Sequence, residues 1–261
     1  MSQKYKKDSL GSRMKRYEKA TGTQLIPRMP TIIRVDGKAF HTFTRKINAE
    51  NDPTHATGPS HKFHRVMQST AHGLAYYMQN TQFVYHQSDE ISILLVDYQG
   101  LQSQQWFGGK VQKMASVSAS MASAYFNVGW GFEFEPASTF PSAAVFDSRV
   151  FQLPKEEVAN YFIWRQQDAT RNSVQMLARK YFSHKETHKK NNSQLQDMLM
   201  LQHDINWNDQ PTWTKRGACI IPDTPSDLKP FSTPWFDDNE IPIFTADRNY
   251  IEKFVYPVAD E

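Results

Sequence analysis

Cysteine is almost absent from this sequence, and long apolar runs are absent altogether. The single cysteine, Cys219, excludes an internal disulfide and any cysteine-based zinc site. No uninterrupted apolar run approaches the roughly 20 residues that a helix needs to cross a bilayer. The charged residues after Met1 have no apolar stretch behind them, so we expect no secretion signal. These absences predict a protein of a reducing compartment, the cytoplasm, with no membrane partner.

A strong net charge is also lacking. The formal charge is only +3, which by itself requires no nucleic-acid partner. The basic residues are nevertheless clustered, at residues 4–19, 45–46, 110–113, 179–190 and 215–216. Such clusters can neutralise phosphates, although solvated surface charge explains any one of them equally well. The distribution of basic residues is compatible with an RNA partner but does not by itself establish one.

Strand and helix signals alternate in the first part of the chain. Ser60 is placed to cap a helix whose apolar residues recur at helical spacing. Ser88, Asp89 and Glu90 separate two strand-like runs and predict a hairpin turn. The signals come in the order strand, helix, strand, strand, helix, strand, at residues 31–35, 60–78, 82–86, 91–96, 110–127 and 143–153. That order predicts an α+β fold, the ferredoxin-like βαββαβ antiparallel sheet with helices on one face.

The remainder of the chain reads as a helical and irregular extension. A helix is expected over residues 155–182, with Glu156 and Glu157 at its positive N-terminal end. The polar residues 183–196 predict a loop or a frayed helix, and five prolines between residues 222 and 243 predict a mostly irregular tail. We expect two parts that pack as one unit, a catalytic domain of residues 1–153 and a C-terminal extension of residues 154–261.

Two carboxylates far apart in the sequence are expected to meet in this fold. Asp36 ends the first strand and Asp89 opens the third, and the topology brings these points to one edge of the sheet. Carboxylate oxygens suit Mg²⁺, with substrate phosphates completing its shell, and two ions roughly 3.5–4 Å apart can clamp a phosphoryl displacement. Gly37 has no Cβ, which lets the backbone approach a metal or a triphosphate. The pattern indicates metal-assisted phosphoryl transfer.

Plainer explanations exist for each feature. Asp-Gly after a strand and Asp-Glu in a hairpin are common turn sequences, so the pattern alone leaves simple turns open. Lysines able to offset phosphate charge are Lys38, Lys46, Lys110 and Lys113. His61 and His64 at helical spacing are more typical of solvated or core histidines than of a zinc site. Trp207 and Trp213 could stack on bases, although packing is their commoner role.

Ordered motifs go further than this pattern. The run Arg34–Phe43 (RVDGKAFHTF) resembles the metal- and nucleotide-binding signature of the tRNA-histidine guanylyltransferase family. Gln87–Glu90 (QSDE) is similar to the family's second acidic motif, and Trp106-Phe107 with the lysines that follow is similar to its basic helix start. Later blocks keep the family's order, with FDSR at 146–149, WRQQD at 164–168, INWND at 205–209 and KRG at 215–217. The chain is thereby identified as a member of that family.

The resemblance implies a palm-type fold, like that of polymerases and nucleotide cyclases, and nucleotide addition in the reverse, 3′-to-5′ direction. In the family, ATP first adenylylates a tRNA 5′-monophosphate. The 3′-hydroxyl of an incoming nucleotide, typically GTP, then displaces AMP. The implied partners are tRNA and nucleoside triphosphates, the implied cofactor is a pair of Mg²⁺ ions, and the implied assembly is a homotetramer.

The resemblance also implies roles for particular residues. Asp36, the Gly37 carbonyl and Asp89 are implied metal ligands, and Glu90 joins Asp36 and Asp89 as an implied catalytic acid. The nucleotide would be held by Lys38, Ala39, Phe40, His41, Ser88, Lys110 and Lys113. Contacts with tRNA are implied for Arg165, Asp168, Arg171, Asn172, Lys215 and Arg216.

One departure bears on the substrate. Eukaryotic enzymes that add guanylate to histidine tRNA carry a His-Ile-Asn-Asn run after the Trp-Arg-Gln block, whereas Thr170–Ser173 (TRNS) stands here. Asp168–Ser173 resembles instead the guanylyltransferase-like proteins of bacteria, archaea and phages, which are similar to template-dependent enzymes that restore 5′-truncated tRNAs. Template-dependent tRNA 5′-end repair is the leading interpretation, and guanylate addition to histidine tRNA is the alternative.

Two further classes stay open. A non-catalytic RNA-binding protein could retain the palm, but binding alone needs no carboxylates near phosphate, so the retained Asp36, Asp89 and Glu90 argue against it. A nucleotide cyclase is disfavoured by the C-terminal motifs.

Overall fold

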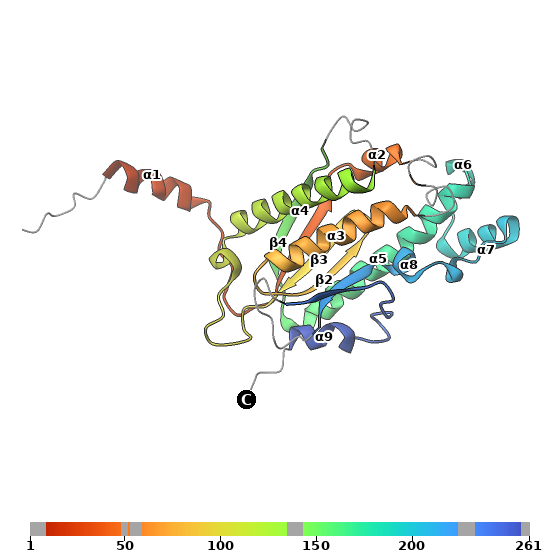
Figure 1. Cartoon of the computed structure of the whole chain (residues 1–261). Coiled ribbons are helices and arrows are strands. Elements are labelled where there is room, and N and C mark those ends of the chain that lie inside the picture. Colours follow the sequence, from red (N-terminus) through yellow and green to blue (C-terminus); the bar gives the residue numbers. More distant parts are fainter. Residues whose placement is uncertain (1–8, 48–51, 53–58, 135–142, 224–232, 257–261) are drawn as a thin grey trace, which may run out of the picture.

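The computed structural model describes residues 9–47, 52, 59–134, 143–223 and 233–256 (Figure 1). Six strands within these residues form one sheet in the order β4-β1-β3-β2-β5-β6, and every neighbouring pair is antiparallel. The strands are β1 Thr31–Gly37, β2 Thr81–Gln87, β3 Glu90–Leu95, β4 Phe146–Gln152, β5 Ala218–Pro222 and β6 Trp235–Asp238. The first four strands have the ferredoxin-like order, so the predicted α+β palm-type fold is confirmed.

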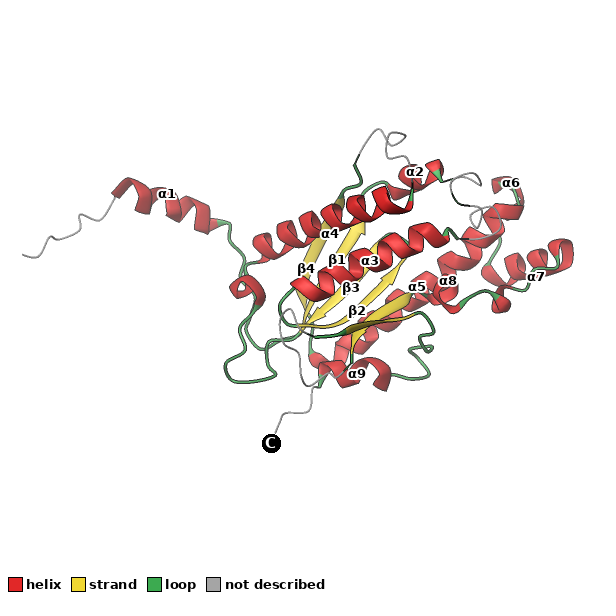
Figure 2. Cartoon of the chain, viewed as in Figure 1, coloured by secondary structure: helices red, strands yellow, loops and turns green. Residues whose placement is uncertain are grey.

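One face of the sheet is covered by α3 (His61–Tyr77) and α4 (Val111–Glu133), as Figure 2 shows. The predicted cap of α3 is present, because the Ser60 hydroxyl accepts a hydrogen bond from the Phe63 N–H at 3.0 Å. Side chains alternate between the faces of a strand, so Ile33 and Val35 of β1 pack into the apolar core beneath these helices. The helices encoded between the palm strands therefore lie on one face, as predicted.

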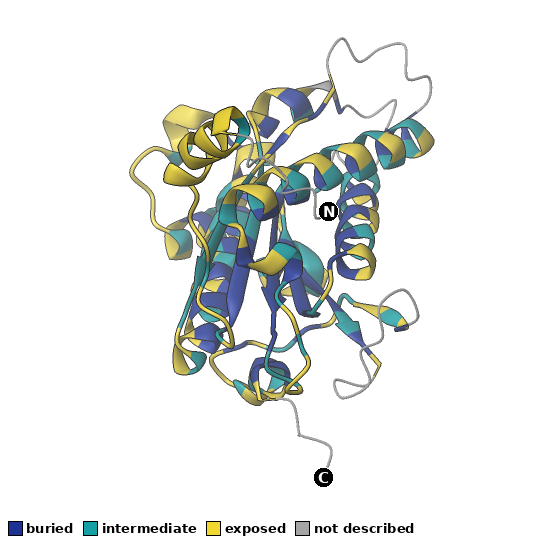
Figure 3. Ribbon diagram, turned by 90° about the vertical axis from the view of Figure 1, so that its left-hand side faces the viewer, coloured by how far each residue is buried: buried dark blue, intermediate teal, exposed yellow. Residues whose placement is uncertain are grey.

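The opposite face is covered by α5 (Lys155–Tyr181) and α9 (Asn249–Val255). Ile32 of β1 lies in this second core together with a group of aromatic side chains, Phe83, Phe162, Phe244 and Phe254. Figure 3 shows the buried residues concentrated where helices and strands face one another. Strands before residue 153 and helices after it thus share one core, while the domain division at that residue stays a prediction.

The second half of α5 packs against two helices that sequence patterns did not resolve. These are α6 (His184–Thr187) and α7 (Asn192–His203), where a loop or frayed helix is predicted. Each begins with a capping box, Ser183 with Glu186 and Asn191 with Gln194. Of these helices, α5 with its C-cap and α7 share an apolar cluster, Val174, Leu177, Ala178, Phe182, Leu195 and Leu199. The Ser-x-x-Glu and Asn-x-x-Gln spacings are the signals that identify both helix starts.

The remaining described elements are α1 (Ser9–Ala20), α2 (Phe40–Phe43), η1 (Thr44–Lys46), η3 (Trp106–Gly109), η5 (Trp207–Asp209) and α8 (Thr212–Arg216). Figure 1 shows α1 projecting from the body. Within its described residues, the tail predicted to be mostly irregular also contains β6, which joins the sheet through β5, and α9. The polar residues 44–59, which include Asp52-Pro53 and Gly58-Pro59, predict a loop, and most of them lie outside the described residues. Within the described part, no helix is both long and apolar enough to cross a membrane.

Candidate active site

The end of β1 meets the β2–β3 turn, as the topology predicts. β2 and β3 are joined by Ser88 and Asp89, and Ser88 adopts a left-handed conformation with φ of 48°. The Gly37 N–H donates a hydrogen bond to the Asp89 carbonyl oxygen at 3.0 Å. Asp36 stands opposite Glu90 in the β1–β3 register. The structure therefore brings Asp36, Gly37, Asp89 and Glu90 together, and we refer to these four residues as the acidic edge.

The electrostatics of the acidic edge favour a bound cation. Burial, and after it the negative charge of Asp36, raise the pKa of Asp89 to about 6. A cation between the two carboxylates would relieve both effects, because it neutralises charge where water is scarce. In the described residues no three His, Cys, Asp or Glu side chains converge as a metal site, so substrate oxygens would complete the shell. That incomplete all-oxygen donor set fits Mg²⁺, which binds through one or two carboxylates plus phosphates.

Gly37 is required for a reason that the sequence pattern did not show. A Cβ on Gly37 would lie 2.3 Å from a ring carbon of Phe40. Phe40 is buried and packs against Phe43, Phe126 and Phe146 with ring centroids 4.9–5.3 Å apart. Glycine thus lets the chain turn over this aromatic cluster directly after Asp36, which fixes the end of β1.

The predicted nucleotide-binding segment, Lys38 to His41, divides into exposed and buried positions. Lys38, Ala39 and His41 are exposed beside the acidic edge, whereas Phe40 points into the core and serves as an anchor. Ala39 adopts the left-handed conformation with φ of 56°, and the Lys38 N–H bonds to the Val145 carbonyl at 2.9 Å. The exposed members are placed to contact a triphosphate. The side chain of Lys46 lies outside the described part.

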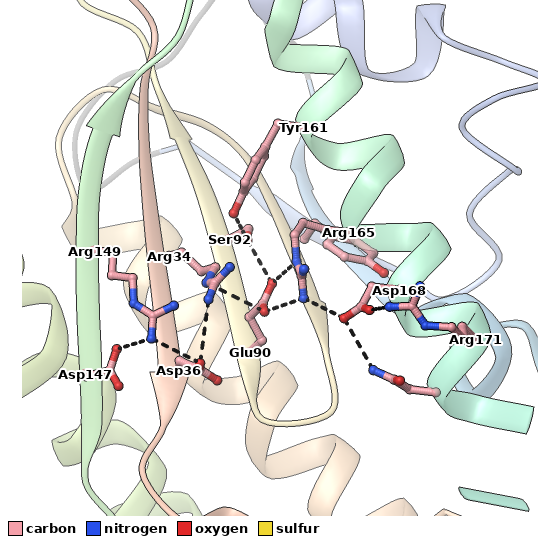
Figure 4. A network of polar contacts seen from close by, with 12 residues as sticks. Arg34, Asp36, Glu90, Ser92, Asp147, Arg149, Tyr161, Arg165, Asp168 and Arg171 are labelled. Carbon is pink, nitrogen blue, oxygen red and sulfur yellow. Dashed lines mark hydrogen bonds and ion pairs between the residues drawn. The ribbon is translucent and has the colours of Figure 1, made fainter. Parts of the chain in front are cut away.

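Glu90 differs from Asp36 in that an arginine is hydrogen-bonded to both of its carboxylate oxygens. It is 5% exposed, and both carboxylate oxygens accept hydrogen bonds from Arg165, each at 2.7 Å (Figure 4). Burial raises the pKa of Glu90 and the Arg165 bonds offset part of that rise. Its oxygens are therefore occupied by Arg165 of α5, which was singled out in the sequence only as a tRNA contact.

Arg34 and Arg149 were not identified as site residues from the sequence. Arg34 lies between two carboxylates, 3.9 Å from Asp36 and 3.8 Å from Glu90. Arg149 of β4 lies 3.9 Å from Asp36 and 3.6 Å from Asp147 (Figure 4). Asp147 stands opposite Asp36 in the β1–β4 register. The position of Asp147 in this register is the feature from which Arg149, two residues later, could have been expected near Asp36. Both guanidinium groups offset the negative charge of Asp36 and can attract a phosphate.

A pocket opens beside the acidic edge, between the start of α3, the end of β2, the second half of α5 and α8. Its lining is mainly apolar or aromatic with a few polar groups, and includes Phe63, Ser88, Asn172, Ser173, Met176 and Trp213. Such a composition is typical of small-molecule sites. Ser88, the residue before Asp89, lines the pocket, whereas the four residues of the acidic edge do not. The pocket and the acidic edge therefore lie on either side of this turn.

His64 and Trp213 form the wall of this pocket by stacking. Their ring centroids lie 4.0 Å apart, and His64 also stacks on His86 at 5.3 Å. Burial lowers the pKa of His64 to about 4 despite its hydrogen bond to Asn239, so the ring is neutral near pH 7. In this structure His64 and Trp213 therefore pack against each other.

The residues implied as tRNA contacts have different surroundings. Arg165 is buried, whereas Asp168, Arg171 and Asn172 follow it along α5 toward the surface. Lys215 donates to the Asn208 carbonyl, and the Arg216 carbonyl accepts a bond from the Tyr85 hydroxyl at 2.8 Å. The Arg171 side chain is 59% exposed and forms an ion pair with Asp168.

Lys110 and Lys113 lie at the other end of the molecule. Lys110 forms an isolated bridge with Gln24, ahead of β1, and directly precedes α4. The Lys113 ammonium lies over the Phe107 ring, 4.5 Å from its centroid. β3 leads away from the acidic edge and α4 begins at its far end (Figure 1). The structure does not bring these lysines to the acidic edge of the same chain.

Comparison with known proteins agrees with the fold. The family model described as tRNAHis guanylyltransferase matches residues 11–154. A bacterial tRNA(His) guanylyltransferase (Thg1)-like protein in complex with ATP is 45% identical, with a TM-score of 0.84 over 95% of this chain and 99% of that chain. A structure of such a protein with GTP is 43% identical, with a TM-score of 0.78 over 95% and 100% of the two chains.

A curated relative is more distant. The tRNA(His) guanylyltransferase of Debaryomyces hansenii is 26% identical over 211 residues, which are 76% of this chain and 75% of that protein. The matched family model spans more than half of the chain and includes the whole acidic edge. This chain belongs to the tRNAHis guanylyltransferase family of nucleotidyltransferases.

Proposed function

We propose that the protein adds nucleotides to the 5′ end of tRNA in the 3′-to-5′ direction, after activating that end with ATP or GTP, in the cytoplasm. The observation that carries this proposal is the pair Asp36 and Asp89, whose charges lie together at the acidic edge. Glu90, by contrast, is neutralised by Arg165. An edge with two carboxylates available and a pocket beside it suits a triphosphate with its metal ions.

In this proposal Asp36, the Gly37 carbonyl and Asp89 hold two Mg²⁺ ions. When bound, Mg²⁺ neutralises phosphate charge and polarises the attacking and leaving oxygens. The exposed Lys38 and His41 contact the triphosphate, and the base enters the pocket beside Ser88. The related bacterial proteins solved with ATP and GTP support nucleotide binding of this kind.

For the substrate, we propose template-dependent repair of 5′-truncated tRNAs. Arg171 and its neighbours stand where the histidine-tRNA enzymes carry the His-Ile-Asn-Asn run, and Arg171 is paired with Asp168 on α5. The identity to the bacterial Thg1-like protein is 45%, against 26% to the Debaryomyces hansenii enzyme. Guanylate addition to histidine tRNA is the second candidate, supported by that same relative.

Matched tRNA transcripts decide between the two. We expect higher kcat/KM when the incoming nucleotide can pair with the opposite strand, for several tRNA identities, because the palm reads no base edge. A lost base pair costs on the order of 1–3 kcal/mol, or roughly tenfold to a hundredfold in rate. Equal values for templated and non-templated addition, or a clear preference for histidine tRNA, would favour the guanylyltransferase candidate.

We also propose that the protein is a homotetramer, as the family resemblance implies. Exposed apolar side chains such as Phe132, Leu201 and Val128 are available for subunit contacts. Light scattering at micromolar concentration should report four times the 30.2 kDa chain mass. A mass of one chain would contradict this proposal.

A further inference from the structure

A row of alternating charges runs along α5 from the acidic edge to the surface. Glu90 accepts two hydrogen bonds from Arg165, and Arg165 donates a further bond to Asp168 at 3.1 Å. Asp168 also pairs with Arg171 and accepts a weak bond from Asn172 at 3.4 Å (Figure 4). Asp168 is therefore the junction between a buried arginine, an exposed arginine and a residue of the pocket wall.

The two arginines of this row differ in how firmly they are held. The Glu90 and Arg165 side chains are each 7% exposed and form a two-pronged pair. Breaking a buried pair of this geometry strands a charge, so this end is fixed. Arg171 is 59% exposed, and exposed ion pairs contribute little net stability. Arg171 can therefore leave Asp168 at small cost, whereas Arg165 cannot leave Glu90.

We infer that Arg171 exchanges Asp168 for a phosphodiester of the RNA substrate, and that Asp168 is a positioning residue rather than an RNA ligand. A guanidinium binds phosphate with two parallel hydrogen bonds, as it binds a carboxylate. Asp168 is not stranded by the exchange, because Arg165 and Asn172 still reach it. The inference rests on the proposed tRNA substrate.

The inference predicts the direction in which RNA affinity changes when Asp168 is removed, and direct contact between Asp168 and RNA predicts the opposite direction. If Asp168 touched RNA, its removal would weaken binding. If Asp168 competes with phosphate for Arg171, Asp168→Asn releases the guanidinium and binding tightens. Any lost negative charge also favours RNA binding in general, so the decisive quantity is the coupling between the two residues. Exchange requires that the gain from Asp168→Asn falls to this general contribution when Arg171 is absent.

A double-mutant cycle on the full chain measures this coupling. The probe is a 5′-monophosphorylated tRNA transcript, and the readout is fluorescence anisotropy at several salt concentrations. Arg171→Ala should weaken binding by about fivefold to tenfold and lower the salt slope by about one. Asp168→Asn alone should tighten binding by about twofold to fivefold, and in the Arg171→Ala background only the smaller general gain from the lost charge should remain. Arg171→Lys should recover part of the affinity and the full salt slope.

Arg179→Ala provides the matched control, since Arg179 is an exposed arginine on the same helix. In that background Asp168→Asn should keep its full effect. A gain from Asp168→Asn that is as large without Arg171 as with it, or a loss of affinity in Asp168→Asn alone, would overturn the inference and leave the proposed function intact. A wild-type chain that does not bind the transcript would overturn both.

Discussion

Asp89→Asn should lower nucleotide transfer by at least about a hundredfold while making the folded protein more stable at pH 7. Asparagine keeps the shape of the side chain but loses the charge that a divalent ion and the transition state require. Removing one such electrostatic contact commonly costs 10²- to 10³-fold in rate, on the order of 3–4 kcal/mol. Asp36→Asn should have an effect of similar size, measured as transfer to a 5′-truncated tRNA in Mg²⁺.

The stability change has a definite sign and pH range. The folded protein raises the pKa of Asp89 from 3.8 to about 6, so ionisation of Asp89 opposes folding above pH 6. Asp89→Asn removes that penalty at pH 7, and the difference between variant and wild type should vanish near pH 4. Thermal unfolding at both pH values, in the absence of divalent ions, measures it.

Asp147→Asn is the matched control, because Asp147 lies on the same edge but is 56% exposed and pairs with Arg149. It should leave transfer within a few-fold of the wild type. Turnover of Asp89→Asn close to that of Asp147→Asn would remove Asp89 from the centre of the reaction.

Arg165→Ala should destabilise the fold by about 3–5 kcal/mol, because it leaves Glu90 buried without its partner. Two weaker contacts would remain: Arg34 lies 3.8 Å from Glu90, too far for a hydrogen bond, and the Ser92 hydroxyl donates a long bond to Glu90 at 3.3 Å. The urea midpoint should fall at an unchanged slope. Glu90→Gln combined with Arg165→Met should recover most of the loss, since it removes both charges and fills the volume.

Arg149→Ala serves as the comparison for that experiment. Arg149 is 53% exposed, and its ion pairs should contribute less than about 1 kcal/mol. If Arg165→Ala destabilised no more than Arg149→Ala, the Glu90–Arg165 pair would not be the fixed end of the charge row. Recovery of stability without recovery of transfer in the double variant would show that Glu90 also has a catalytic role.

The central sheet was predictable because its signals are local and repeated. β-branched strands, the Ser60 cap and the hairpin turn each agree with the ferredoxin-like topology, and the topology then joins Asp36 to Asp89. β5 was not predicted, because Ala218–Pro222 is short and its pairing partner, β2, lies far away in the sequence. Pairing between strands so far apart in the sequence produces no local pattern of apolar residues from which it could be predicted.

The site was predictable in its carboxylates but not in their orientation. Asp89 lies in the turn and Glu90 begins β3, and the side chains of successive residues in an extended chain point in opposite directions. Only α5, a late element, shows that Glu90 is directed to Arg165. The position of Lys110 and Lys113 followed from the topology itself, since a helix after β3 must begin at the far end of the sheet. The prediction that Lys110 and Lys113 bind phosphate considered only their position at the start of a helix and not the end of the sheet at which that helix begins.

The length of α5 restricts how substrate choice can change in this family. One rigid helix carries Phe162 under the sheet, Arg165 on Glu90, Arg171 at the surface and Met176 on the pocket wall. Each residue added to a helix turns everything beyond it by about 100° and advances it by about 1.5 Å. An insertion or deletion between Arg165 and Met176 would therefore misdirect the surface arginine and the pocket wall together. We therefore expect α5 to tolerate substitutions at constant length better than insertions or deletions between these two residues.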